Sequence, residues 1–335
     1  MRTELLRLVG RRLVQLAVVL VVVSFFTFLL IRLLPGDPVQ TIIPFGQGPQ
    51  FAHERAQLRA DLGLNKGFFG QYWSYLTGLL QGKLGHQYSS SLPVSTLVKQ
   101  SLPVSLQLMI YAQVISLVFA IPLGVLAAYR AGTKTDSAIN TSSFALLALP
   151  NFVLALLLSF FIGAKLKWLP TGGYAPGWLD PLFDGSQHMN IAQHLRYMVL
   201  PAFTLAVGQI AVYMRLLRSD MIATLQENFI TLAKAKGLKN RRILWRHALR
   251  PSSLTMLTVA GLNVGTLIGG AVVVEVIFQI PGMGEKIFQA IASRSYVELQ
   301  SYVVIIAVLF VVINFMVDFL YAVLDPRIRR ARTAT

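Results

Sequence analysis

The sequence predicts an all-α integral membrane protein with six transmembrane helices. The chain of 335 residues is 55% hydrophobic and only 13% charged, which is more apolar than a soluble domain of this length can bury. A helix that crosses the bilayer needs about 20 apolar residues. Six charge-free intervals approach or exceed that length, namely residues 13–31, 100–129, 137–164, 197–214, 251–274 and 299–317.

The first interval is expected to remain in the mature protein as a transmembrane helix. Arg11 and Arg12 precede it, as basic residues precede the core of a signal peptide. Its apolar run covers residues 13–31, whereas the core of a signal peptide is about 7–15 residues long. The sequence LIRLLPGDP follows, without a small-residue cleavage site.

Basic residues in the connecting segments predict the orientation. Six spans place both termini on one side, and the segments of that side hold 19 of the 30 Lys and Arg in 73 residues. The segments of the other side hold 11 in 124 residues. Because Lys and Arg concentrate in cytoplasmic loops, both termini are expected to be cytoplasmic. The net charge of +16 then reflects topology, and nucleic acid is not an expected partner.

The region between the first two spans predicts a small extracytoplasmic subdomain. The stretch ERAQLRADLGL has apolar residues at helical spacing, and Gly63 suggests its end. The aromatic stretch GFFGQYWSYLTGLL follows, and such rings are enriched at lipid headgroups. We therefore expect this subdomain to pack on the membrane surface.

The longest cytoplasmic segment contains a basic stretch, LAKAKGLKNRRILWRHALRP, with seven Lys or Arg and no acid. Asn228 is suited to cap a short helix that Gly237 closes in a left-handed conformation. Lys234 and Lys236 then lie in its last turn, where positive charge suits the helix dipole. Asn240 begins a second helix, and Pro251 opens the fifth transmembrane helix.

The short helix is expected to need a partner surface. A helix of about eight residues is marginal alone in water. Phe229, Leu232 and Ala233 fall on one face of it. Either the segment lies on anionic lipid or it docks a cytoplasmic protein.

Enzyme motifs are missing from the sequence. A nucleotide-binding loop of the form GxxxxGK[ST] is absent, because the only Gly-Lys pair, Gly82-Lys83, is followed by Leu84. His53-Glu54 begins a HExxH pattern, but Gln57 replaces the second His. His188 and His194 are predicted to be exposed loop histidines. The chain is therefore not expected to be an enzyme.

Two acids next to apolar intervals are expected to serve structure rather than transport. Glu275 and Asp318 flank their intervals near opposite membrane faces. Each is predicted to be solvated or paired with a base such as Arg327. The alternative is a role in transport, because charged residues inside a membrane often mark functional sites. An ion-coupled secondary transporter is the alternative from a different class. It would need repeated halves and coupling charges near the midplane, and the six intervals show neither.

The stretch TLAKAKGLKNRRILWRHALRP resembles the cytoplasmic loop of ABC-importer permeases for dipeptides, oligopeptides and nickel. LIRLLPGDP, VVVEVIFQIPGMGEKIFQAI and LYAVLDPRIRR resemble other parts of the same family, in the same order along the chain. The resemblance implies the type I importer permease fold. It also implies an ATPase-coupling loop whose residues are Phe229, Thr231, Leu232, Ala233, Ala235, Gly237 and Leu238, with small Ala233 and Ala235 allowing close approach.

The resemblance also implies a domain division and partners. Residues 1–34 form the N-terminus and first helix, 35–94 the extracytoplasmic subdomain, 95–324 the transporter domain with coupling loop 218–250, and 325–335 a basic tail. The partners are a second homologous permease, two ABC ATPases and an extracytoplasmic solute-binding protein in the bacterial inner membrane. ATP and Mg are expected on the ATPases, and this chain is expected to bind no cofactor. Dipeptides or short oligopeptides are the expected substrates, and nickel chelates or glutathione are the alternatives.

Overall fold

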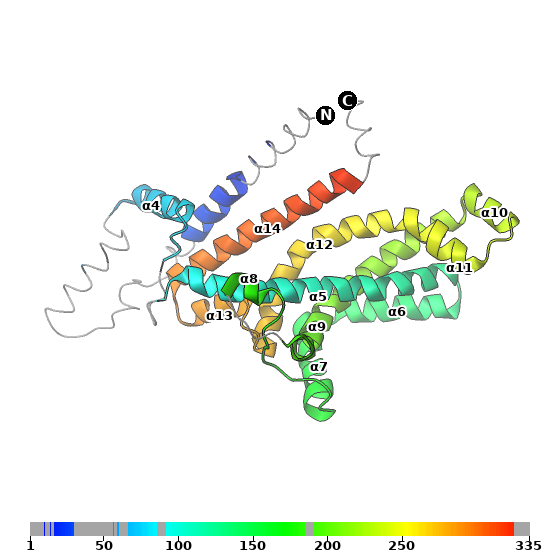
Figure 1. Ribbon diagram of the computed structural model, residues 1–335, viewed down its shortest axis with the longest axis horizontal. Helices are drawn as coiled ribbons and strands as arrows, with labels where there is room; N and C mark the ends of the chain where they lie inside the picture. Colours follow the sequence, from blue (N-terminus) through cyan, green and yellow to red (C-terminus); the bar gives the residue numbers. More distant parts are fainter. Residues whose placement is uncertain are drawn as a thin grey trace. The chain divides into compact units, whose positions relative to one another are not determined.

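The computed structural model describes residues 10, 14, 17–29, 56, 59, 66–85, 92–184 and 190–324. Every regular element in these ranges is a helix, as predicted. The chain divides into two compact units (Figure 1). Unit 1 is Met1–Leu102 with Glu285–Phe315, and unit 2 is Pro103–Gly284 with Met316–Thr335. Helices α5 (Val94–Tyr129), α13 (Met283–Ala292) and α14 (Tyr296–Leu324) each belong to both units in part.

In unit 1, aromatic side chains join the first apolar helix, Ala17–Leu29, to α4 (Phe68–Leu80). The rings of Phe25 and Phe28 each contact those of Phe68 and Tyr72 edge-on or tilted, with centroids 5.4–6.3 Å apart. The hydroxyl of Tyr72 lies 3.0 Å from that of Ser24, which is buried. The predicted aromatic segment is therefore a helix held to the first one by ring packing.

The outer face of α4 keeps apolar groups exposed. Phe69 is 79% exposed and Trp73 is 66% exposed. Their position at lipid headgroups stays a prediction. The preceding predicted helix, ERAQLRADLGL, lies mostly outside the described residues. Only its Ala56 and Arg59 are described, and both are helical.

The helices of unit 2 differ in length, and the longest of them run beside one another (Figure 1). Besides α5 they are α6 (Lys134–Ala148), α7 (Asn151–Leu158), its π-helical continuation η1 (Ser159–Lys165), α8 (Asp180–Asp184), α9 (Ile191–Leu225), α10 (Asn228–Ala235), α11 (Asn240–Arg242), η2 (Ile243–Ala248) and α12 (Leu249–Phe278). Close packing joins α5 to α9, because a Cβ on Gly124 would lie 3.1 Å from the carbonyl oxygen of Met214.

The described helices account for four or five membrane spans. Four are long and apolar enough to cross a bilayer, over residues Val94–Tyr129, Ile191–Leu225, Asn240–Phe278 and Val297–Val317. The pair formed by α6 and α7–η1 makes a fifth if it is one bent span. The first predicted span, residues 13–31, corresponds to the apolar helix Ala17–Leu29, which is shorter within the described residues.

The third predicted span is not a continuous helix. The chain bends by 100° between α6 and α7–η1. Pro150 precedes α7, and Leu149 before it has the extended conformation, with φ −82° and ψ 120°. This follows from the clash between a proline ring and a preceding helical residue. Pro103, Pro122 and Pro201, in contrast, stay inside α5 and α9.

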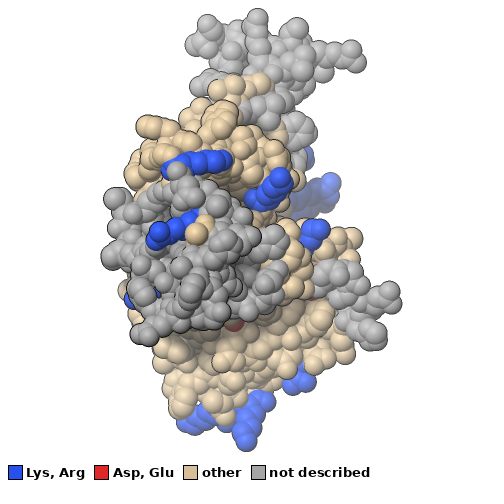
Figure 2. All heavy atoms as spheres, turned by 90° about the vertical axis from the view of Figure 1, so that its left-hand side faces the viewer, with Lys and Arg blue, Asp and Glu red and all other residues tan. Residues whose placement is uncertain are grey.

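The fifth span begins earlier than predicted. The helical chain continues from Asn240 through η2 into α12, which opens at Leu249. Pro251 therefore lies inside a continuous helical segment, close after the π-helical η2, and does not open it. On the face shown in Figure 2, most of the described surface is uncharged, and Lys and Arg side chains stand apart from one another.

Candidate functional site

The segment that is predicted to be cytoplasmic forms a short helix closed by a left-handed glycine. Helix α10 ends at Ala235, and Gly237 has φ +74°, as predicted. The N–H of Leu238 donates to the carbonyl of Ala233, which pairs an otherwise open C-terminal carbonyl of the helix. The predicted cap is wrong by one residue. Glu227 occupies the cap position without a side-chain hydrogen bond, and Asn228 is the first helical residue.

Helix α10 has one buried and one exposed apolar face. Ile230 is fully buried and Ala233 is only 7% exposed. Phe229 is 47% exposed and Leu232 is 57% exposed. Ala233 therefore does not share the exposed face expected from its spacing, and the close approach that its small side chain permits is to the chain's own helices. Thr231, Ala235 and Gly237 are exposed, and Leu238 is half-buried.

The buried face of α10 rests on the ends of several longer helices. Ile230 and Ala233 belong to one apolar cluster with residues of α5, α9, η2 and α12, namely Val125, Ala128, Leu217, Met221, Ile243, Ala248 and Met256. Ser252 of α12 donates to Thr224 of α9 over 2.8 Å beside this cluster. A displacement of α10 would therefore disturb the packing of the helices that enter the membrane.

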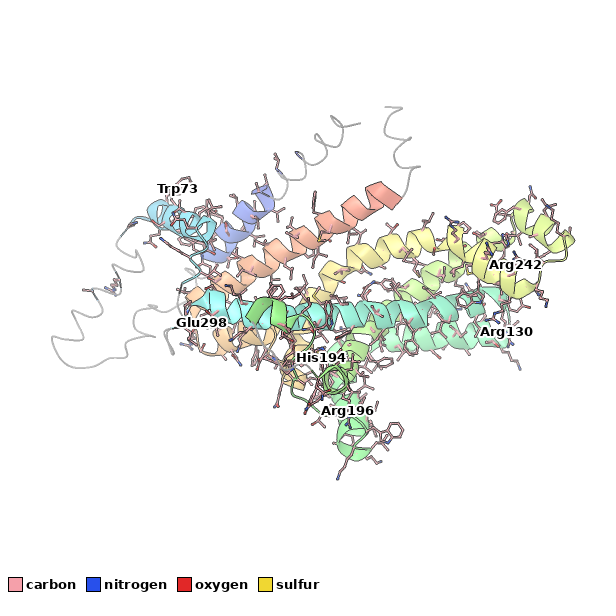
Figure 3. All side chains as sticks on the ribbon, in the orientation of Figure 1. Trp73, Arg130, His194, Arg196, Arg242 and Glu298 are labelled. Atoms are coloured by element: carbon pink, nitrogen blue, oxygen red, sulfur yellow. The ribbon has the colours of Figure 1, made fainter. Side chains whose placement is uncertain are left out.

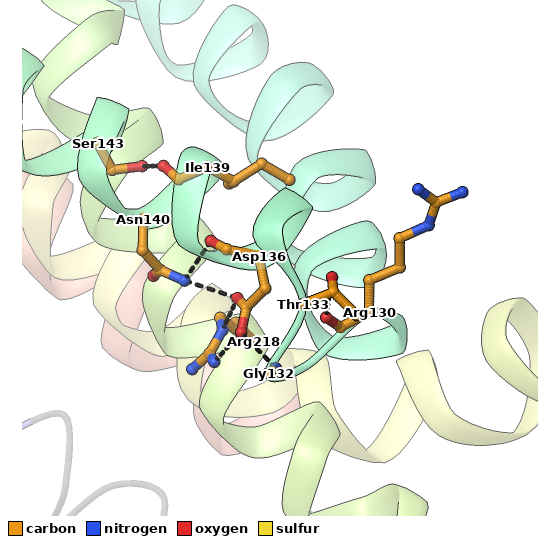
Figure 4. A network of polar contacts seen from close by, with 8 residues as sticks. All are labelled: Arg130, Gly132, Thr133, Asp136, Ile139, Asn140, Ser143 and Arg218. Carbon is orange, nitrogen blue, oxygen red and sulfur yellow. Dashed lines mark hydrogen bonds and ion pairs between the residues drawn. The ribbon is translucent and has the colours of Figure 1, made fainter.

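An ion pair joins the start of α6 to α9 (Figure 4). The guanidinium of Arg218 donates from Nε and Nη2 to the two carboxylate oxygens of Asp136, each over 2.6 Å. Asp136 also accepts from the N–H of Gly132 at 3.0 Å and from Asn140 at 2.7 Å. A bidentate pair of this kind fixes orientation as well as distance. It ties the start of α6 to the part of α9 that carries Arg218.

Sequence reasoning did not identify this ion pair. Asp136 directly precedes a charge-free interval and Arg218 lies within a turn of the end of another, which is the signal that could have suggested them. They are 82 residues apart, so the sequence alone does not show that they meet.

Exposed basic side chains lie on α10 and on the segment that follows it. Lys234, Lys236, Arg241, Arg242 and Arg246 are all exposed. Arg130 and Arg242 lie at the same end of unit 2 (Figure 3). The result is an apolar pair, Phe229 and Leu232, within a basic surface.

Glu275 is not solvated, which excludes the first of the two states predicted for it. It is fully buried at the end of α12. Ser105 donates to its Oε1 over 2.6 Å, and the N–H of Gly284 donates to its Oε2 over 2.7 Å. The Ser105 hydroxyl in turn accepts from the N–H of Met283 at 2.8 Å. Glu275 thus organises the turn after α12 through hydrogen bonds. The side chain of Asp318, and Arg327, lie outside the described residues.

His194 is also buried rather than exposed. It lies on α9, is 1% exposed, and its Nδ1 is 2.6 Å from the carbonyl oxygen of Ala175 (Figure 3). His53 and His188 lie outside the described residues. The predicted loop position of His194 is wrong because α9 begins at Ile191, before the charge-free interval.

A buried polar cluster lies beside His194. Tyr174 donates to Oδ2 of Asp180 over 2.6 Å, and Gln107 donates to the same oxygen over 3.2 Å. Burial and then the hydrogen bond to Asp180 raise the pKa of the Tyr174 phenol, which therefore stays protonated as a donor. This cluster holds the loop after η1 against α5.

The chain matches two family models that together cover most of it. Residues 120–330 match the binding-protein-dependent transport system inner membrane component, and residues 5–109 match the N-terminal part of such a membrane component. An oligopeptide transport system permease protein of Bacillus subtilis is 36% identical over 320 residues, covering 95% of this chain and 98% of that protein. A probable peptide ABC transporter permease protein of Sinorhizobium fredii is 35% identical with the same coverage of both chains.

A di/tripeptide transport system permease protein of Pseudomonas aeruginosa is 34% identical over 342 residues, covering 98% of this chain and all of that protein. The helical fold, the apolar spans and these matches agree with one another. The chain therefore belongs to the family of binding-protein-dependent transport system inner membrane components, which are multi-pass permease components, not ATPases, of ABC importers.

Proposed function

We propose that this chain is a permease subunit of an ATP-driven importer and forms half of the path for dipeptides or short oligopeptides. An extracytoplasmic binding protein delivers the substrate. Three relatives that match nearly the full chain are named for the transport of peptides, oligopeptides and di- or tripeptides. Their agreement supports a peptide substrate more than nickel chelates or glutathione, the alternatives within the same family.

The assembly that we propose contains a second homologous permease and two ABC ATPases, which bind ATP and Mg. The termini of this chain lie in the cytoplasm, which is supported by the excess of Lys and Arg in the segments on that side. Closure of the ATPases on ATP shifts the permease pair from the inward- to the outward-facing state. ATP, bound at the ATPases, acts on this equilibrium by favouring the outward-facing state.

The observation that carries the coupling role is the division of α10 into two apolar faces. Ile230 and Ala233 are buried in the chain's own cluster, whereas Phe229 and Leu232 are 47% and 57% exposed. A helix this short is marginal alone in water and gains most of its stability from packing of its apolar faces. We assign the exposed pair, with Thr231, Ala235 and Gly237 beside it, to a groove on an ATPase. The surrounding bases then pair with acids of the ATPase.

Reconstitution tests the function directly. Proteoliposomes that contain this chain, the second permease and the ATPases should take up a labelled dipeptide only with binding protein and ATP. Nickel or glutathione uptake without dipeptide uptake would select one of the alternative substrates. Dipeptide uptake by this chain alone would overturn the proposal in favour of an ion-coupled secondary transporter.

A substitution on the exposed face tests the coupling role. Leu232→Ser should reduce co-purification of the ATPases and uptake at least about tenfold, because an apolar anchor of an interface contributes on the order of 2 kcal/mol. Leu80→Ser on α4 is the matched control, since Leu80 is 82% exposed and lies on the predicted extracytoplasmic side. Equal co-purification in the two variants would contradict docking through α10.

A further inference from the structure

Unit 2 carries a row of uncharged polar side chains on membrane helices. We call this the amide row, and it consists of Asn151 at the start of α7, Gln209 of α9, and Asn263 and Thr266 of α12. Asn263 donates to Oε1 of Gln209 over 3.0 Å. Gln209 donates to Thr266 at 3.4 Å. Asn151 extends the row along α12, because its Nδ2 would lie 3.5 Å from a Cβ on Gly270.

The amide row lies on an accessible surface of the unit. Thr266 and Asn151 are exposed, and Gln209 and Asn263 are half-buried. The neighbouring glycines leave room, since a Cβ on Gly208 of α9 or Gly269 of α12 would meet nothing within 4 Å. This face therefore combines polar groups with open space, unlike the face of α5 that exposes Val114, Val118 and Phe119.

The hydrogen-bonding capacity of the row is not used up inside the chain. A carboxamide offers two donors and two acceptor lone pairs. Gln209 and Asn263 use part of theirs on each other and on Thr266, and Asn263 also hydrogen-bonds Tyr213. The side chain of Asn151 makes no hydrogen bond to the described part of the chain. Leaving such groups against hydrocarbon is costly, so this face is not a lipid-facing surface.

The break before Asn151 points in the same direction. Helix α6 has 15 residues and is about 22 Å long at 1.5 Å per residue, shorter than the roughly 30 Å hydrocarbon core. A helix that starts at the cytoplasmic boundary therefore ends within the membrane. Leu149, Pro150 and Asn151 at the break are all exposed. Irregular backbone at this depth is tolerated where it lies in protein or lines a water-filled cavity.

We propose that the amide row lines the translocation path and hydrogen-bonds the peptide groups of the passing substrate. A carboxamide has the same donor and acceptor as a peptide bond, so it pairs with backbone N–H and C=O whatever the substrate side chains are. The row has no charged member, as suits a path that carries peptides of differing charge. This inference rests on the proposed peptide transport and names the residues that contact the substrate.

The absence of cysteine from the chain allows a direct test. Thr266→Cys places a single thiol in the amide row, and Gly269→Cys places one beside it. Val118→Cys places one on the apolar face of α5. Each variant is assembled with the second permease, the ATPases and the binding protein in proteoliposomes. A charged, membrane-impermeant thiol reagent is then applied with and without trialanine. Only thiols that are accessible to water react with this reagent.

We expect labelling of the thiols at positions 266 and 269, protection of both by trialanine, and no labelling at position 118. Adding Gln209→Leu to the Thr266→Cys chain should raise the trialanine concentration for half-protection about fivefold, the effect of one lost neutral hydrogen bond. A tripeptide with larger apolar side chains should protect as well as trialanine.

Three results would overturn the inference. Labelling in the isolated chain but not in the assembled complex would assign the row to the contact with the second permease. No labelling in either would assign it to lipid, and labelling without protection by trialanine would remove the substrate contact. A wild-type complex that takes up no peptide refutes the proposed substrate, whereas the labelling without peptide still reports whether the row meets water.

Discussion

Single glycines set the geometry at two places in this permease, and at one of them the sequence alone was sufficient. Gly237 could be predicted as a left-handed helix end because the signal is local, a glycine directly after a short helical pattern. The role of Gly284 could not be predicted. It depends on Glu275 and Val272, whose burial and position against the turn do not follow from a local pattern.

Gly237 should be needed for ATPase docking more than for folding. A side chain at φ +74° costs roughly 1 kcal/mol, and an acid there also opposes the dipole of α10. Gly237→Asp should therefore lower uptake and ATPase co-purification strongly, and Gly237→Asn should do so less, because Asn carries no negative charge beside the end of the helix. Uptake and co-purification from membranes measure both effects.

Gly82→Asp is the matched control for this substitution. Gly82 has φ +73°, and a Cβ there also meets nothing within 4 Å. The backbone cost is the same, but Gly82 follows α4 on the predicted extracytoplasmic side. Normal co-purification of the ATPases with Gly237→Asp, or an equal loss with Gly82→Asp, would refute a specific role of the α10 turn in docking.

Gly284→Ala should destabilise the chain by roughly 1–3 kcal/mol. A Cβ there would lie 2.4 Å from Cα of Val272 and 2.9 Å from Oε2 of Glu275. Relief would require the backbone to shift and would weaken the 2.7 Å hydrogen bond from the Gly284 N–H to Glu275. The thermal unfolding midpoint of the purified chain in detergent measures the effect.

Gly208→Ala is the control because its Cβ meets nothing within 4 Å in α9. Replacing a helical glycine with alanine in open space should keep or slightly raise the midpoint. Equal midpoints of the two variants would show that the turn after α12 is not tightly packed.

At the scale of the helices, charge-free intervals predicted where the spans lie but not their course. The interval 137–164 contains both α6 and α7, and nothing in its charge pattern shows the 100° bend. Pro150 is a local signal for a break in the helix, but Pro122 and Pro201 are prolines of the same kind and stay inside helices. The packing around each proline decides between these outcomes, and packing depends on distant residues. For the same reason, the burial of Glu275 and His194 could not be predicted.

The ion pair between α6 and α9 should contribute measurably to stability. Arg218→Met leaves the carboxylate of Asp136, whose side chain is 6% exposed, without its bidentate partner. Breaking a buried pair costs roughly 3 kcal/mol, and this pair should cost somewhat less because the Arg218 side chain is 26% exposed. Arg218→Lys should be intermediate because it keeps the charge but loses the fork.

A double-mutant cycle isolates this pair. Asp136→Asn with Arg218→Met should be less destabilising than the sum of the single changes by about 1–3 kcal/mol. Arg130→Met is the control, since its exposed hydrogen bond to Thr135 should contribute little. Thermal unfolding in detergent gives the four midpoints. Strict additivity of Asp136→Asn and Arg218→Met would contradict the coupling between α6 and α9.

For the whole molecule, composition and charge distribution were sufficient to predict the membrane class, and the order of motifs along the chain was sufficient to predict the family. Both are sums over many residues, so single errors do not change them. The contacts that the amide row would make could not be predicted in this way. Gln209 and Asn263 are 54 residues apart, and only the packing of α9 on α12 brings them together.

The orientation of the whole chain gives a last prediction. Ala131 lies between α5 and α6 on the predicted cytoplasmic side, and Ala192 lies in the first turn of α9 on the opposite side. Both side chains are exposed, and the chain has no other thiol to interfere when either is replaced by cysteine. In intact spheroplasts an impermeant thiol reagent should label Ala192→Cys and not Ala131→Cys, and permeabilisation should make both react. A reporter fused after Arg332 should be cytoplasmic, because an even number of spans leaves both termini on the side where Lys and Arg are concentrated. Labelling of Ala131→Cys in intact spheroplasts would reverse the orientation and place α10 on the side without ATP.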